Sequence, residues 1–424
     1  MKFSDFPQAV IKENVDYTVK EITNVIKKYG PRESGNENCY AAQKHIKKEM
    51  DTFCDGTEFE SYKMAPKAFL HFTKLVSVVI FLAVVACAIL MYTSIITPLL
   101  AQCIVCGVVF VGLFITVMEF LLYKQFMDPL YKKIEAHNLM GVRKPRGEVK
   151  RRIVISGHID AAYEWRHLYY GKKVPFMAIF MSWTIGGAIV SFILSVIAIV
   201  ANFVDMGTFG DFMINYSYIF HFVTALGMVT LFMFVDFNTI SPGANDNLTG
   251  TYAAVCALRM LDMAGVDFEN TEVCAMITDG EEAGLRGCKS WAKNHYDEYV
   301  NSGVETVVLC VDTLTDRDYL RVYNKDMTGT VKNNQQFSQL VMDASKDAGY
   351  DDIEFSSVVF GSSDAAAFSQ AGITATCLAA MDPRPADYYH NRRDTADRLV
   401  PETIKTGFDV IISTILNFDE KGLN

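Results

Sequence analysis

The stretch SPGANDNLTGTYAAVCALRMLDM, residues 241–263, joins a tight polar loop to a helical pattern. The loop places one carboxylate, Asp246, between two asparagines and between two glycines. Residues 249–263 carry apolar side chains at helical spacing, which predicts a helix with a buried face. The sequence therefore indicates a helix that opens directly from a polar loop around a single acid.

Short apolar runs elsewhere in the chain fit the strands of a buried sheet. Residues 151–157, 271–278, 306–312 and 374–381 are such runs, and helical patterns such as 333–348 separate them. Strands that alternate with helices favour a mostly parallel sheet with helices on its faces. We therefore expect a mixed α/β fold, with a mostly parallel sheet flanked by helices.

Three long runs without a charged residue interrupt the polar sequence, at 75–118, 174–204 and 212–235. A helix needs about 20 apolar residues to cross a bilayer, so the first run is long enough for two spans. A very apolar soluble core is the alternative, but core helices are usually shorter and carry polar stripes. We predict four membrane spans that form two hairpins. Their ranges are 74–94, 101–123, 176–202 and 215–235.

The predicted domain boundaries follow from these runs. Residues 1–67, 124–173 and 236–424 are expected to form one globular domain, with most of the candidate metal ligands in the last piece. Residues 68–123 and 174–235 are expected to be transmembrane hairpins inserted into that domain, which makes the lipid bilayer a partner. The sequence is silent on the oligomeric state.

Basic residues gather at one end of the predicted hairpins, whereas the connecting tips at 94–101 and 203–216 carry none. The excess of lysine and arginine on cytoplasmic loops then places the polar domain in the cytoplasm. The residues at the basic end are Lys63, Lys67, Lys74, Lys124, Lys132, Lys133, Arg166, Lys172 and Lys173.

The overall charge argues against a nucleic-acid partner. The formal net charge is -10, and a protein that binds phosphate backbones needs a concentrated basic face. The ten cysteines show no spacing typical of a disulfide framework or a zinc ribbon.

Histidines and acids follow the predicted strands. Ligand sites in open α/β sheets form at the carboxyl ends of the strands, so we expect these side chains to share one edge. So many carboxylates at one edge would repel each other unless cations lay among them. The residues that follow the strands are His158, Asp160, Asp279, Glu281, Glu282, Asp312, His390 and Asp394.

Oxygen and imidazole ligands together suit Zn²⁺, with Mn²⁺ or Co²⁺ as alternatives. A second glutamate beside a ligand glutamate is typical of a base that acts on metal-activated water, which indicates hydrolysis.

At these residues the chain resembles the M28 family of metallo-aminopeptidases. The ordered set comprises His-x-Asp at 158–160, Gly-Ala-Asn-Asp-Asn at 243–247, Glu-Glu at 281–282, Asp312, and Tyr-His followed by Asp-Thr within 389–395. The resemblance covers the polar pieces and leaves the hairpins out. It implies a zinc-aminopeptidase-like fold and the removal of N-terminal residues from peptide substrates.

The resemblance also implies roles for individual residues in a site with two Zn²⁺ ions. Asp246 would bridge the two ions. Glu281 would be the general base, Asp160 would orient His158, and Tyr389 is a candidate to steady the oxyanion. The remaining ligands would be His158 and Asp312 for one ion, and Glu282 and His390 for the other.

The chain departs from the family pattern at two positions in the site. Asn245 stands where an acid is common, and Ala365 follows Asp364 where a histidine is frequent, which bears on the substrate pocket. Asn245 and Asn247 are expected to tie down the loop around Asp246 through side-chain hydrogen bonds.

Several other functions remain open on the sequence alone. Glutaminyl cyclisation occurs on a similar scaffold that uses a single zinc. A membrane receptor or scaffold without catalysis typically loses ligands, whereas this chain keeps the full set. A carboxypeptidase or a small-molecule amidohydrolase would carry the same motifs.

Overall fold

The chain divides into two compact units in a computed structural model, which describes all residues except 172–175, 360, 385 and 424. The first, which we call the polar unit, comprises Met1–Pro66, Lys133–Tyr163 and Asn238–Asn424. The second, the helical unit, comprises Lys67–Lys132 and Glu164–Phe237. The predicted boundary between residues 173 and 174 lies outside the described residues, as do Lys172 and Lys173.

The polar unit is built on a mixed sheet, for which the described residues supply nine strands in the order β1-β2-β6-β3-β7-β11-β8-β10, with β9 paired to β8. The central strands β6, β3, β7 and β11 run parallel, whereas β1 and β2 extend one edge antiparallel. The strands are β1 (Gly56–Met64), β2 (Ile134–Arg143), β3 (Arg151–His158), β6 (Thr271–Thr278), β7 (Glu305–Leu314), β8 (Leu320–Asp326), β9 (Val331–Lys332), β10 (Glu354–Ser357) and β11 (Ala375–Ala380).

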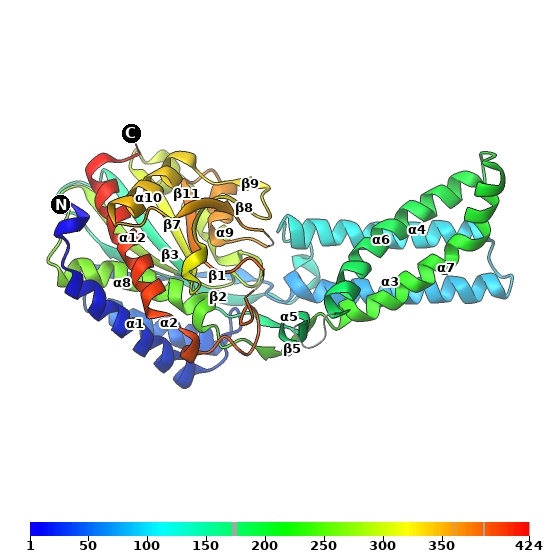
Figure 1. Cartoon of the computed structure of the whole chain (residues 1–424), viewed down its shortest axis with the longest axis horizontal. Coiled ribbons are helices and arrows are strands. Elements are labelled where there is room, and N and C mark those ends of the chain that lie inside the picture. The colour runs from blue at the N-terminus through cyan, green and yellow to red at the C-terminus, as the bar shows by residue number, and fades with distance from the viewer. Residues whose placement is uncertain (172–175, 360, 385, 424) are drawn as a thin grey trace. The chain divides into compact units, whose positions relative to one another are not determined.

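Helices cover both faces of this sheet (Figure 1). Alternate residues of a strand point to opposite faces. Val307, Leu309 and Val311 of β7 therefore join the apolar core under α8, while Cys310 faces Asp364 of α11. The expected α/β fold is confirmed. The helices of this unit are α1 (Gln8–Tyr29), α2 (Glu37–Met50), α8 (Thr249–Met263), α9 (Arg286–Asn294), α10 (Gln335–Asp347), α11 (Asp364–Gln370) and α12 (Pro401–Lys421).

Two glycines let the start of α8 approach the sheet closely. A Cβ atom on Gly250 would lie 2.2 Å from the backbone oxygen of Val311, and one on Gly157 would lie 2.3 Å from the carbonyl carbon of Gly250. Both positions exclude any side chain. The loop that precedes α8 is therefore held directly above the ends of β3 and β7.

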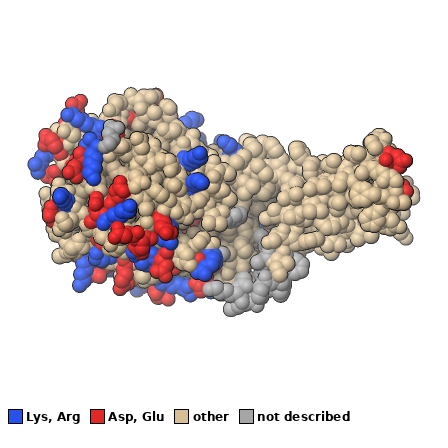
Figure 2. Space-filling model, turned by 45° about the horizontal axis from the view of Figure 1, so that its top comes forward, with Lys and Arg blue, Asp and Glu red and all other residues tan. Residues whose placement is uncertain are grey.

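The helical unit consists of two long hairpins and one short helix. Its helices are α3 (Ala68–Tyr92), α4 (Pro98–Thr116), α5 (Arg166–Gly171), α6 (Phe176–Ala201) and α7 (Gly207–Phe232). The short strands β4 (Tyr163–Trp165) and β5 (Val235–Ile240) pair where the chain passes between the units. Figure 2 shows charged side chains concentrated on the polar unit and largely missing along the visible face of the long helices.

Four described helices are long and apolar enough to cross a membrane: Ala68–Tyr92, Pro98–Leu121, Ser182–Ala201 and Gly207–Phe232. They match the four predicted spans, but α3, α4 and α7 begin earlier than expected, α3 and α7 by the most. α3 begins before Lys74, whose ammonium lies over the ring of Phe237, 4.5 Å from its centroid. α7 takes in Asp211, which is exposed near the first turn. Charged residues near a helix end can thus be accommodated without ending the helix.

Candidate metal centre

His158 is the last residue of β3, and its buried imidazole turns toward the loop before α8. The hydroxyl of Thr251 donates to the backbone oxygen of His158 at 2.6 Å, which fixes the end of the strand against α8. His158 Nδ1 lies 3.1 Å from the backbone oxygen of Asp160 and 3.5 Å from its carboxylate. The other ring nitrogen, Nε2, is left facing the candidate ligands.

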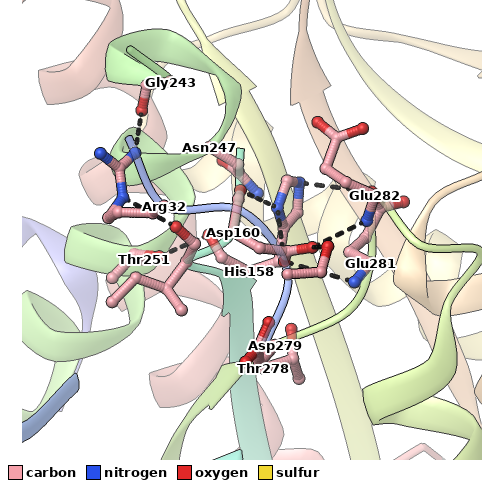
Figure 3. Close-up of polar contacts among 12 residues, drawn as sticks. Arg32, His158, Asp160, Gly243, Asn247, Thr251, Thr278, Asp279, Glu281 and Glu282 are labelled. Carbon is pink, nitrogen blue, oxygen red and sulfur yellow. Dashed lines mark hydrogen bonds and ion pairs between the residues drawn. The ribbon is translucent and has the colours of Figure 1, made fainter. Parts of the chain in front are cut away.

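Asp160 itself organises the neighbouring loops more than it contacts the imidazole. Its carboxylate accepts hydrogen bonds from the Ser34 hydroxyl at 2.6 Å and from the backbone N–H groups of Glu281 and Glu282 at 3.3 and 3.0 Å. Figure 3 shows Asp160 beside Glu281 and Glu282. A single buried carboxylate thus joins the end of β3, the loop after β6 and the segment between α1 and α2.

The loop around Asp246 is held by side chains on both sides. Asp394 accepts from the backbone N–H groups of Asn245 and Asp246, at 2.8 and 3.0 Å, and from the Asn245 amide at 2.8 Å. The Asn247 amide donates to the backbone oxygen of Val311 at 2.9 Å. The expectation that both asparagines tie down the loop is confirmed. The peptide bond between Asp246 and Asn247 is cis.

Each oxygen of Asp246 faces a different imidazole. Oδ1 lies 3.4 Å from His158 Nε2, and Oδ2 lies 3.3 Å from His390 Nε2. Although desolvation opposes ionisation, the two imidazoles hold the pKa of Asp246 below its ordinary value. Asp246 is therefore an ionised carboxylate placed between two histidines, one for each of its oxygens.

The two consecutive glutamates follow β6 and approach different histidines. Glu282 Oε2 lies 3.5 Å from His390 Nε2, whereas Glu281 Oε2 lies 3.8 Å from His158 Nε2. Burial raises the pKa of both carboxyl groups well above the ordinary value, and neighbouring carboxylates raise it further. One glutamate thus accompanies each imidazole.

Asp312, near the end of β7, is the most open of the predicted ligands, with a side chain 25% exposed. Its Oδ1 lies 4.0 Å from His158 Nε2. Possible ligand atoms of His158, Asp246 and Glu282 all lie within 4.8 Å of one another. Desolvation, followed by the charge of Asp246, raises the pKa of Asp312 to about 7.

The chemistry of these side chains fits divalent cations. The nitrogen-to-oxygen distances of 3.3–3.5 Å resemble the separation of two ligands on one tetrahedral ion, about 3.3–3.5 Å for bonds near 2.1 Å. Within the described part of the chain, Glu282 Oε1 is buried without a hydrogen-bond partner. Buried carboxylates need a partner, and cations between them would supply it.

The residues between α1 and α2 belong to the surroundings of the site, although the sequence did not assign them a role. Arg32, fully buried, donates to the backbone oxygens of Ile159 and Gly243 at 2.9 and 3.0 Å. The N–H of Gly35 contacts both carboxylate oxygens of Asp279 at 3.1 Å. A buried arginine that binds only backbone oxygens leaves no sequence motif, so nothing in the sequence motifs indicated this segment.

Comparisons with known proteins concern the family and the fold. The model of peptidase family M28 matches residues 229–415. A search of curated proteins found no match.

Solved structures with a similar fold include a zinc aminopeptidase from Bacillus subtilis, at 13% identity and a TM-score of 0.53, covering 95% of this chain and 94% of that one. An aminopeptidase from Aneurinibacillus is 14% identical, with a TM-score of 0.54 and coverage of 95% and 93%. A glutaminyl cyclase from Bacteroides thetaiotaomicron is 13% identical, with a TM-score of 0.53 and coverage of 97% of both chains. At these identities the likeness establishes the fold.

The polar unit thus carries the fold shared by zinc aminopeptidases, and the M28 match includes the loop of Asp246, both glutamates, Asp312 and His390. Residues 229–415 of the chain, which carry most of the side chains gathered at the end of β3, thus match the model of peptidase family M28.

Proposed function

We propose that the chain is a membrane-anchored aminopeptidase that holds two zinc ions and removes N-terminal residues from peptides. The observation that carries this proposal is the position of Asp246, whose two oxygens face His158 and His390 at 3.4 and 3.3 Å. One carboxylate that presents one oxygen to each imidazole is suited to bridge a pair of ions. His158 and Asp312 would hold one ion, and Glu282 and His390 the other.

The bound ions would supply positive charge for the substrate carbonyl and favour the ionisation of water. Glu281 is the proposed general base because its raised pKa lets it take a proton from water and hand it to the leaving amine. Its partner Glu282 lies closer to an imidazole and is a ligand in this scheme. Tyr389, whose ring stacks on that of His390 with centroids 3.8 Å apart, is proposed to steady the oxyanion.

Asp160 acts through other residues. Because it holds the N–H groups of Glu281 and Glu282, it would fix the separation of the base from the ligand. We therefore expect it to matter for the glutamate loop as much as for the orientation of His158. Such supporting contacts commonly change metal affinity or activity by about 10–100-fold.

The proposed location is the membrane, with the polar unit in the cytoplasm. Four helices of spanning length support the anchor, and the basic residues that flank them support the orientation. Labelling a single cysteine introduced in the 203–216 tip of a variant without other reactive cysteines tests this orientation. A membrane-impermeant reagent should reach it from outside intact cells, and labelling only after permeabilisation would reverse the orientation.

Glutaminyl cyclisation is the second candidate because the ligand atoms of one trio, His158, Asp246 and Glu282, lie within 4.8 Å of one another and could hold a single ion. A substrate panel separates the two activities. Free-amine aminoacyl anilides, their acetylated forms and peptides with N-terminal glutamine should be offered with and without a chelator. Aminopeptidase activity predicts chelator-sensitive hydrolysis of the free-amine substrates alone. Cyclisation of the glutamine peptides with no amide hydrolysis would favour the alternative.

A further inference from the structure

A second group of metal-ligand side chains lies away from the site described above, between α1 and α2. It consists of Glu21 on α1 and of His45 and Glu49 on α2. His45 and Glu49 are four residues apart and share one face of their helix, which is turned toward Glu21. We call these three residues the helix cluster.

The helix cluster has the spacing of ligands around one ion. His45 Nε2 lies 3.6 Å from Glu21 Oε2 and 3.4 Å from Glu49 Oε1. A charge-assisted hydrogen bond would be shorter, about 2.7–2.9 Å. Among the described residues, this buried nitrogen has no hydrogen-bond partner. A similar spacing, 3.3–3.5 Å, separates the imidazoles from Asp246 and Glu282 at the end of β3.

Each glutamate is oriented by its second oxygen. The Asn24 amide donates to Glu21 Oε1 at 3.1 Å, and the Tyr252 hydroxyl contacts Glu49 Oε2 at 3.4 Å. The remaining oxygens, Glu21 Oε2 and Glu49 Oε1, are those that face His45. Outer hydrogen bonds that orient a carboxylate in this way are typical of protein metal sites.

Burial and exposure also suit an exchangeable ion. The side chains of Glu21, His45 and Glu49 are 10%, 26% and 18% exposed, so the cluster is partly covered and still reachable from solvent. Two carboxyl groups brought together away from water therefore need either a shared proton or a cation.

We propose that the helix cluster is a zinc site in which His45 Nε2, Glu21 Oε2 and Glu49 Oε1 are the protein ligands and water completes the shell. One imidazole with two carboxylates suits Zn²⁺, with Mn²⁺ and Co²⁺ as competitors, whereas Ca²⁺ prefers oxygen ligands alone. The site does not depend on the proposed peptidase activity.

Such an ion would tie together the two helices on either side of residues 30–36. Arg32, Ser34 and Gly35 in that segment hold the backbone of Ile159, the carboxylate of Asp160 and the carboxylate of Asp279. The zinc of the helix cluster therefore stabilises the position of residues 30–36, which contact the residues around His158.

The test compares zinc content and melting temperature in four full-length proteins: wild type, His45→Ala, Glu49→Gln and the control His295→Ala. His295 also lies between two glutamates, but at 2.5 Å from Glu60 and 2.9 Å from Glu298, one on each ring nitrogen. These are hydrogen bonds, so its loss should release no metal. After dialysis against micromolar zinc, mass spectrometry counts the metal in each protein.

The proposal expects His45→Ala and Glu49→Gln each to hold about one zinc fewer per chain than wild type and His295→Ala. Both should also lose part of the rise in melting temperature that zinc produces in wild type. An unchanged zinc count in a folded Glu49→Gln protein would overturn the site and leave a proton shared by the two glutamates. The zinc count is then repeated for His45→Ala and Glu49→Gln in proteins that also carry Asp246→Asn. Because that substitution should remove the zinc of the candidate catalytic site, only the helix-cluster zinc should remain to be lost.

Discussion

Buried histidines in the two units lie in opposite surroundings. In the polar unit, His158 and His390 each face carboxylates at 3.3–4.0 Å. In the helical unit, His221 of α7 lies among neutral groups: Gln102 Oε1 at 2.9 Å, Ser191 at 3.1 Å and Ser195 at 3.2 Å. Its ring nitrogens are satisfied by hydroxyl and amide groups, with no ion needed.

Buried histidines thus serve two purposes, depending on whether their neighbours are neutral or charged. A neutral network that satisfies its own hydrogen bonds can join α4, α6 and α7 inside an apolar environment. Where carboxylates surround imidazoles, burial and neighbouring carboxylates raise the pKa values of Glu281, Glu282 and Asp312. Bound cations would stabilise the charged forms of these carboxylates. The first arrangement stabilises helix packing, and the second is where we propose that bound ions activate water.

The largest expected effect comes from Glu281→Gln in the polar unit. The amide keeps the size of the side chain but cannot take a proton, so kcat should fall by about 10²–10⁴-fold. Zinc content should stay at the wild-type level because the proposed ligands are intact. Steady-state kinetics and metal analysis on the same preparation check both statements, and near-wild-type turnover would remove Glu281 from the role of base.

Asp394→Ala should have the next largest effect. It leaves the N–H groups of Asn245 and Asp246 buried without their acceptor, at a cost of about 1–3 kcal/mol for each unsatisfied group. We expect a lower melting temperature and zinc affinity reduced by about 10–100-fold. Asp397→Ala, three residues along at an exposed position, is the matched control. Equal behaviour of the two variants would show that Asp394 does not hold the Asp246 loop.

His221→Leu probes the other side of the comparison. Hydrogen bonds between membrane helices average about 0.6 kcal/mol, so the helical unit should lose only a small part of its stability. Hydrolysis and zinc content should be unchanged, because no predicted ligand is altered. Loss of zinc in this variant would contradict the view that His221 supports helix packing alone and that the ions bind only in the polar unit.

The smallest effect is expected at His137 on β2, which stacks on Tyr40 with ring centroids 3.9 Å apart. Desolvation lowers the pKa of His137 below its ordinary value, with Glu135 opposing the shift. The native state thus binds its proton less tightly than the unfolded chain. Above the unfolded pKa, near 6.5, His137 is neutral in both states and does not reduce the free energy of unfolding. As the pH falls from there through the folded pKa, the unfolded chain binds the proton more readily, so the free energy of unfolding decreases.

The check is the pH dependence of unfolding. Between pH 7.5 and pH 5.5, wild type should lose slightly more free energy of unfolding than His137→Gln. The variant keeps a polar side chain but has no group that titrates in this range. A larger acid-dependent loss in the variant would show that His137 gains a proton partner on folding.

Much of the fold was predictable because its signals are local. The helix 249–263 and the strand 271–278 have the predicted bounds, since apolar periodicity and polar loops mark both of their ends. The antiparallel strands β1 and β2 were not predicted. Polar residues interrupt Gly56–Met64 and Ile134–Arg143, and their pairing joins segments on either side of a whole hairpin.

The surroundings of the site were harder to predict than its candidate ligands. Histidines and acids after strands form a recognisable pattern, whereas Ser34 reaches Asp160 across 126 positions of sequence. The helix cluster carries only an ordinary helical spacing of His45 and Glu49. What brings Glu21 to them is the packing of α1 against α2, which no local pattern reveals.

The central claim is that the acids and imidazoles at the end of β3 lie together because divalent cations bind among them. The most direct test counts zinc in the His45→Ala protein before and after adding Asp246→Asn, so that the helix cluster does not contribute. We predict a fall from about two zinc ions per chain to none, with loss of hydrolysis. A folded His45→Ala protein that hydrolyses peptides without bound metal would contradict the account.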